Sequence, residues 1–143
     1  RAIEGPLIVQ PVTWTIVFNR EAATWWASWL ALGRYKHVRA YAYVPFLHVW
    51  VFYDVNLAGT DIVIAADGEP ASKMIESWIE NADLLQMKRQ GGARMRALPP
   101  LGAWCVPAVK RLLGLQCVAL RPDALYRHCL RNGGIPFHGL SKS

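Results

Sequence analysis

The stretch HVRAYAYVPFLHVWVFYD, residues 37–54, contains two apolar and aromatic segments separated by a short centre that includes Pro45. Residues 37–43 and 48–54 are rich in the β-branched and aromatic side chains that favour strands. The four residues between them fit a short connection between antiparallel strands. The stretch therefore predicts a β-hairpin.

The segments on either side of this hairpin extend the pattern. Further strands are expected at residues 7–12, 13–18, 61–66 and 116–120, and a possible short strand at 84–88. Helices are expected at residues 22–33, from about Pro70 to 79, at 104–114 and at 122–131, with a loop at 90–100. This order predicts one α+β domain over residues 1–143, with a mainly antiparallel sheet and helices packed on it.

The composition excludes several classes of protein. Of the 143 residues, 53% are hydrophobic and 18% are charged, which excludes an intrinsically disordered chain. No apolar run reaches the roughly 20 residues that span a bilayer, and no signal peptide is apparent, so neither segment is expected. Three cysteines are too few, and odd in number, for a disulfide scaffold.

The net charge of +6 raises the question of an acidic partner. The best basic patch consists of Lys88, Arg89, Arg94 and Arg96, placed around a Gly-Gly pair. Binding of nucleic acid calls for a continuous basic face and a recognition motif, and no such motif is present. A solvated loop is therefore the favoured interpretation of the patch, and nucleic acid ranks last among the expected partners.

The hairpin carries two residues that suit acid–base chemistry. If its turn is centred between Pro45 and Phe46, His37 and Asp54 are directly opposed on one face, with Cβ atoms about 4.5–5.5 Å apart. A carboxylate at that distance can fix the tautomer of an imidazole and stabilise its protonated form. A register shifted by one residue would put the two on opposite faces. A strand-end surface histidine and a turn-forming aspartate remain the simpler alternatives.

Cys105 stands where a loop meets the start of an apolar-faced helix. Unpaired backbone N–H groups and the helix dipole favour a thiolate there and can hold an oxyanion. A nucleophilic thiol also needs a nearby base, and His37 is the candidate. The alternative is an inert buried cysteine, which is the expectation for Cys117 and Cys129. A metal pair of His37 with His48 lacks further ligands at suitable spacing, so no metal is expected.

The order of these three residues resembles that of circularly permuted papain-like cysteine peptidases. The strings GRYKHV at residues 33–38 and WCVPAVKRLLG at residues 104–114 resemble small phage and prophage proteins of that kind. The resemblance covers about residues 13–131. It implies Cys105 as nucleophile, His37 as general base and Asp54 as orienting acid, on an antiparallel sheet that packs against the helix of the cysteine.

The same resemblance implies further properties of the site. Such folds often place a Gln shortly before the Cys as an oxyanion donor, but no Gln lies between Gly91 and Cys105. The indole N–H of Trp104 is the candidate replacement, and Gln116 could serve only if the fold brings it near. The resemblance implies no cofactor, a protein or peptide substrate, and a location in a phage virion or the cytoplasm of a bacterial host.

Two function classes therefore remain. The first is a phage-encoded thiol hydrolase, either a cysteine peptidase or an amidase. The alternative is a structural or adaptor protein of a phage tail or capsid on a hydrolase-like fold, with other virion proteins as partners. The seven Trp residues favour this alternative if they are exposed, because Trp is enriched at the centres of protein interfaces.

Overall fold

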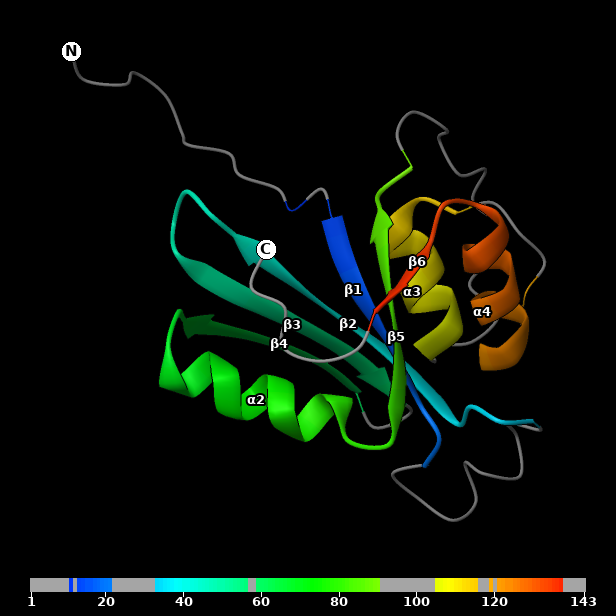
Figure 1. Cartoon of the computed structure of the whole chain (residues 1–143), viewed down its shortest axis with the longest axis horizontal. Helices are drawn as coiled ribbons and strands as arrows, with labels where there is room; N and C mark the ends of the chain where they lie inside the picture. The colour runs from blue at the N-terminus through cyan, green and yellow to red at the C-terminus, as the bar shows by residue number, and fades with distance from the viewer. Residues whose placement is uncertain are drawn as a thin grey trace.

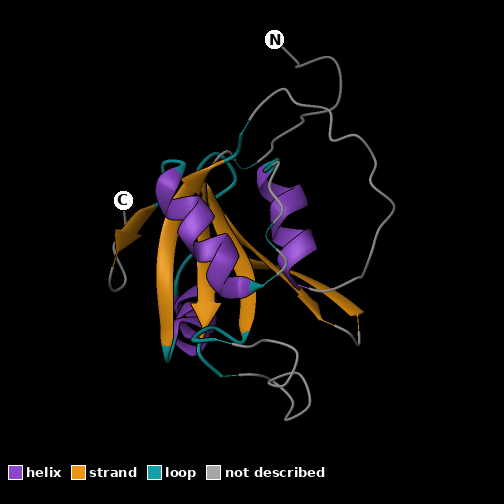
Figure 2. Cartoon of the chain, turned by 90° about the vertical axis from the view of Figure 1, so that its right-hand side faces the viewer, coloured by secondary structure: helices purple, strands orange, loops and turns teal. Residues whose placement is uncertain are grey.

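The structure is a computed structural model that describes residue 11 and residues 13–21, 33–56, 59–90, 105–115, 119 and 121–137. These residues form a six-stranded antiparallel sheet with helices packed on both faces (Figure 1). The predicted α+β class, with an antiparallel sheet and packed helices, is confirmed. Figure 2 shows the twist of the sheet, whose strands run in visibly different directions.

The strands follow the spatial order β4-β3-β2-β1-β5-β6. The central strand β1 (Thr13–Asn19) pairs with β2 and β5, and its last six residues are buried. The other strands are β2 (His37–Val44), β3 (Val49–Asn56), β4 (Gly59–Ala66), β5 (Ala82–Lys88) and β6 (Ile135–Phe137). The short edge strand β6 was not predicted, because three residues around a proline give almost no strand pattern.

The described helices are α2 (Glu69–Ile79), α3 (Cys105–Leu113) and α4 (Pro122–Arg131). Proline stands in the first turn of α2 and of α4, where its missing N–H removes no intrahelical hydrogen bond. Each helix buries one apolar face, as the spacing of its hydrophobic residues predicts. None of these described helices is long and apolar enough to cross a membrane.

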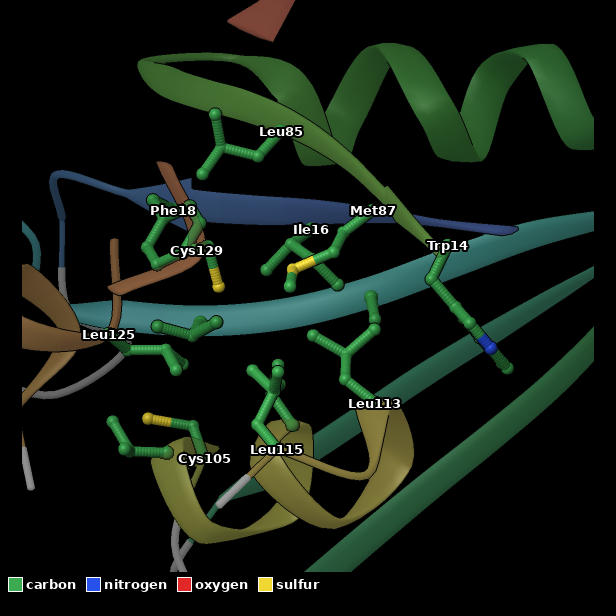
Figure 3. Close-up of a cluster of buried hydrophobic side chains, with 14 of the residues drawn as sticks. Trp14, Ile16, Phe18, Leu85, Met87, Cys105, Leu113, Leu115, Leu125 and Cys129 are labelled. Carbon is green, nitrogen blue, oxygen red and sulfur yellow. The ribbon is translucent and has the colours of Figure 1, made fainter. Parts of the chain in front are cut away.

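Alternation along the strands creates two hydrophobic clusters, one on each face of the sheet. In β1, Ile16 and Phe18 point to the face covered by α3 and α4, whereas Val17 points to the face covered by α2. Figure 3 shows the larger cluster, in which side chains from β1 and β5 meet those of α3 and α4. Cys105, at the start of α3, lies at one end of this cluster.

The predicted hairpin forms, but its turn lies one residue further along the chain. The turn comprises Pro45–His48, and the ladder between β2 and β3 runs from Val44–Val49 to Ala40–Tyr53. The predicted direct opposition of His37 and Asp54 is therefore wrong. Because the pairing shifts by two residues, both side chains still point to the same face.

Several predicted segments lie wholly or almost entirely outside the described residues. These are the strand at 7–12, the helix at 22–33 with its Trp residues, and the loop at 90–100. Most of the predicted strand at 116–120 lies outside as well, and Ala119, which is described, belongs to no strand. The remaining predicted elements are confirmed, with bounds that differ by a few residues.

Candidate active site

His37 is the first residue of β2, and the segment that leads to it is anchored from three sides. The Asp123 carboxylate in α4 accepts the backbone N–H groups of Arg34 and Tyr35, at 2.9 and 2.8 Å. The Tyr35 hydroxyl donates to Asp83 in β5, and the backbone N–H of Lys36 donates to the carbonyl of Asn19, at 2.8 Å. The position of His37 therefore depends on contacts with β1, β5 and α4.

The His37 ring pairs with Asp54, as the sequence predicts, although along a diagonal. His37 Nε2 lies 2.6 Å from Asp54 Oδ1, and each side chain is 16% exposed. The backbone ladder between the two strands ends at Ala40–Tyr53, so this side-chain hydrogen bond joins β2 and β3 beyond their last paired residues. The carboxylate thereby fixes which nitrogen of the ring carries a proton.

Cys105 is the first residue of α3, and its thiol interacts with the ring of His37. Its helix packs against both β2 and β3, the two strands that carry the histidine and the aspartate. The residue is 8% exposed, and its side chain lies with Leu125 at one end of the buried cluster (Figure 3). Since Nε2 of His37 is held by Asp54, Nδ1 is the ring nitrogen left for the thiol.

The surroundings of His37 raise its pKa from 6.5 to about 9. Burial acts in the opposite direction and lowers the pKa, because it disfavours the charged ring. Hydrogen bonds to Asp54 and Cys105, and the negative charges of both, raise the pKa and outweigh the burial. The raised pKa favours the protonated form of the His37 ring at neutral pH.

Arg39 also belongs to the site, although the sequence did not point to it as a candidate. Arg39 Nη1 lies 3.8 Å from Asp54 Oδ2, and Arg39 Nε donates to Asn19 Oδ1 at 3.0 Å. The guanidinium also stacks over the ring of Trp78 in α2, 4.3 Å from its centroid. The available signal was the spacing of Arg39 two residues after His37, which puts both on one face of the strand.

The other candidate residues are not brought to this site within the described part of the chain. His48 lies in the turn at the far end of β2, where its Nδ1 is 3.2 Å from the Tyr43 hydroxyl, so it forms no pair with His37. Lys88 and Arg89 are exposed at the end of β5. Cys129 is buried in the core as expected. Trp104, Gln116, Cys117, Arg94 and Arg96 lie outside the described residues.

The described chain thus brings together a thiol, an imidazole and a carboxylate, with a guanidinium behind the carboxylate. No group of three or more His, Cys, Asp or Glu side chains suited to a metal ion occurs among the residues that the structure describes. A scan against protein-family models, a search of curated proteins and a search of solved structures each returned no match to this chain.

Proposed function

We propose that this protein is a papain-like thiol hydrolase, a cysteine peptidase or amidase, with Cys105 as the nucleophile. His37 serves as the general base and acid, and Asp54 orients its ring. The observation that carries the proposal is that one imidazole contacts both the thiol of Cys105 and the carboxylate of Asp54. These contacts bring residues from three elements to the arrangement that nucleophilic catalysis requires.

The chemistry follows from this arrangement. With its proton on His37, the Cys105 sulfur attacks the carbonyl carbon of an amide and forms a tetrahedral oxyanion. The carbon–nitrogen bond then breaks, and the leaving amine takes the proton from His37. A water molecule next gives a proton to His37 and attacks the acyl-enzyme, and the acid is released with the thiolate. Asp54 holds the imidazole in place and stabilises its protonated form throughout.

Donors for the oxyanion are the remaining requirement of the proposal. The start of α3 supplies backbone N–H groups at Cys105 and Val106, whereas Pro107 has none to offer. The indole of Trp104 stays the proposed side-chain donor. Protein and peptide substrates are the first to screen, and the resemblance to phage and prophage proteins favours virion proteins, cell-wall peptides and host proteins.

The decisive experiment measures the alkylation rate of each cysteine with iodoacetamide between pH 5 and 9, followed by mass spectrometry of the peptides. We expect Cys105 to react faster than Cys129 and Cys117, and to keep its reactivity below pH 8, where a free thiol loses it. His37→Gln should lower the rate at neutral pH about tenfold or more, because the imidazolium that stabilises the thiolate is gone.

Matched variants separate chemistry from accessibility. Cys129→Ala should leave the labelling of Cys105 unchanged, whereas Cys105→Ala should remove the fast phase. Folded protein in which Cys105 reacts no faster than the other two cysteines would contradict the proposal. A small reagent is needed, because only 8% of Cys105 is exposed.

A partner-binding protein is the second candidate, and exposed apolar side chains favour it. Phe46 and Leu47 are exposed at the tip of the β2–β3 hairpin, and Ile62 and Ile64 are exposed on the edge strand β4. Exposed apolar side chains that gather on one surface often mark interaction sites. Retention of a partner by Cys105→Ala, together with loss of retention on Phe46→Ser, would support this function and is compatible with the hydrolase.

A further inference from the structure

Asp54 has a second carboxylate as its direct neighbour. In the ladder between β3 and β4, Asp54 stands opposite Asp61, so the two Cβ atoms are about 4.5–5.5 Å apart on one face. Like charges directly opposed across two strands destabilise the pair. A further cation beside Asp54 would offset this repulsion.

Arg39 supplies that cation at a defined position. The two oxygens of Asp54 have different partners: Oδ1 lies 2.6 Å from His37 Nε2, and Oδ2 lies 3.8 Å from Arg39 Nη1. The hydrogen bond at Oδ1 and the ion pair at Oδ2 together favour one orientation of the carboxylate. Extending the β2–β3 register by one pair puts Arg39 directly opposite Asp54, which explains how it reaches the oxygen that His37 leaves open.

The guanidinium is itself held in place by neutral groups. Its Nε–H donates to Asn19 Oδ1 at 3.0 Å, while Asn19 Nδ2 donates to the backbone carbonyl of Trp78, also at 3.0 Å. The indole of Trp78 covers the face of the guanidinium, at 4.3 Å. A lysine could provide the charge, but not this combination of a fixed N–H donor and a flat stacked surface.

We propose that Arg39 is a positioning residue of the thiol site, which holds the Asp54 carboxylate turned toward His37 against the charge of Asp61. Arg39 reaches the site at Asp54 Oδ2, so its proposed effect on His37 passes through Asp54. The effect of Arg39 on His37 is independent of the proposed hydrolase, and only its consequence for catalysis rests on that function.

The test measures the pKa of the His37 imidazole by NMR titration in wild type, Arg39→Met, Arg39→Lys and Lys73→Met. Lys73 pairs with Glu69 on the exposed surface of α2 and controls for the loss of one positive charge. Among the described residues, the charged groups paired with or opposed to Asp54 are His37 and Arg39 from β2 and Asp61 from β4. Cys105 from α3 faces His37.

We expect Arg39→Met to lower the pKa of His37 by about one unit or more, a tenfold change in its ionisation constant. Arg39→Lys should lower it by less, and Lys73→Met should leave it unchanged. The direction of the shift is informative: simple removal of a neighbouring positive charge would raise the pKa of His37. A fall points to a weakened partner of the imidazolium, and Asp54 is the partner that Arg39 contacts.

A double variant tests the role of Asp61. Adding Asp61→Asn to Arg39→Met should bring the pKa of His37 part of the way back to its wild-type value, because the charge that repels Asp54 is removed. A folded Arg39→Met variant with an unchanged or raised pKa of His37 would overturn the proposal. If Arg39→Met does not fold, Arg39→Lys provides the test. An unchanged pKa of His37 in that variant would overturn the proposal.

The alkylation rate of Cys105, measured on the same samples, separates this inference from the proposed function. A fall in the pKa of His37 without preferential labelling of wild-type Cys105 would leave Arg39 as a positioning residue and remove the hydrolase. Preferential labelling of Cys105, with a pKa of His37 that does not change when Arg39 is replaced, would support the hydrolase and remove the role of Arg39.

Discussion

His37 Nε2 lies 2.6 Å from Asp54 Oδ1, although the two residues are diagonal neighbours on β2 and β3. Diagonal positions on one face are close enough for long side chains to meet. The diagonal leaves the place opposite Asp54 to Arg39, so two groups from one strand approach a single carboxylate from neighbouring positions.

Replacing Asp54 by Asn should lower the pKa of His37 from about 9 toward its ordinary value of 6.5. The neutral amide keeps the shape of the carboxylate but removes the charge that stabilises the imidazolium, so we expect a fall of about one unit or more. NMR titration of the imidazole measures this value. Asp67→Asn is the control, since Asp67 accepts the Trp50 indole N–H near the other end of the hairpin and should leave His37 unchanged. Equal effects of the two variants would refute the assignment.

The free energy of unfolding should fall as the pH rises from about 6.5 to about 9. The folded state raises the pKa of His37, so its contribution is fully present below pH 6.5 and lost as the pH passes through about 9. At about 1.4 kcal/mol per pKa unit, the full contribution is about 3 kcal/mol. Urea unfolding at pH 6, 7.5 and 9 measures it. His37→Gln should remove this part of the pH dependence, and an unchanged slope would show that other groups cause it.

In α4, truncation of a core side chain should cost far more than truncation of an exposed one. Leu125 is 0% exposed and packs in the cluster that holds Cys105, whereas Leu130 in the same helix is 39% exposed. We expect Leu125→Ala to destabilise the protein by about 2–5 kcal/mol, because it leaves a cavity. Leu130→Ala should cost less than about 1 kcal/mol. Chemical denaturation of both variants tests this, and similar losses would contradict the packing of α4.

Gly33 and Gly68 form a natural pair for testing the anchor of the segment before His37. Both have a positive φ, +120° and +115°, so alanine is strained at either position. A Cβ at Gly33 would also collide with the carboxylate of Asp123, whereas a Cβ at Gly68 meets nothing within 4 Å. Gly33→Ala should therefore be the more destabilising by about 1 kcal/mol or more, because Asp123 must release the N–H groups of Arg34 and Tyr35.

Thermal unfolding of the two glycine variants provides the comparison. Gly33→Ala should also slow the alkylation of Cys105, since the anchored segment leads directly into His37. Gly68→Ala should leave that rate unchanged. Equal losses of stability in the two variants would show that the contact with Asp123 contributes nothing.

Local chemistry along the chain was enough to predict most of the described elements. The apolar and aromatic segments around Pro45 predict β2 and β3, and the spacing of apolar residues after Pro70 and Pro122 predicts α2 and α4. These signals are strong because strand alternation and helical periodicity are properties of adjacent residues. Local patterns of this kind also predicted Cys105 at the start of a helix, and His37 and Asp54 on one face of a hairpin.

Contacts between residues from distant segments were decided by the tertiary structure. The register of the hairpin depends on the four residues of its turn, and a shift of two residues replaced an opposed pair by a diagonal one and put Arg39 beside Asp54. The contact between Cys105 and His37 arises because α3 packs against β2 and β3, far from them in sequence. Asn19, Trp78 and Asp61 came to the site from three further elements. Pairing between distant segments depends on how whole faces fit together, and no local pattern of residues contains that information.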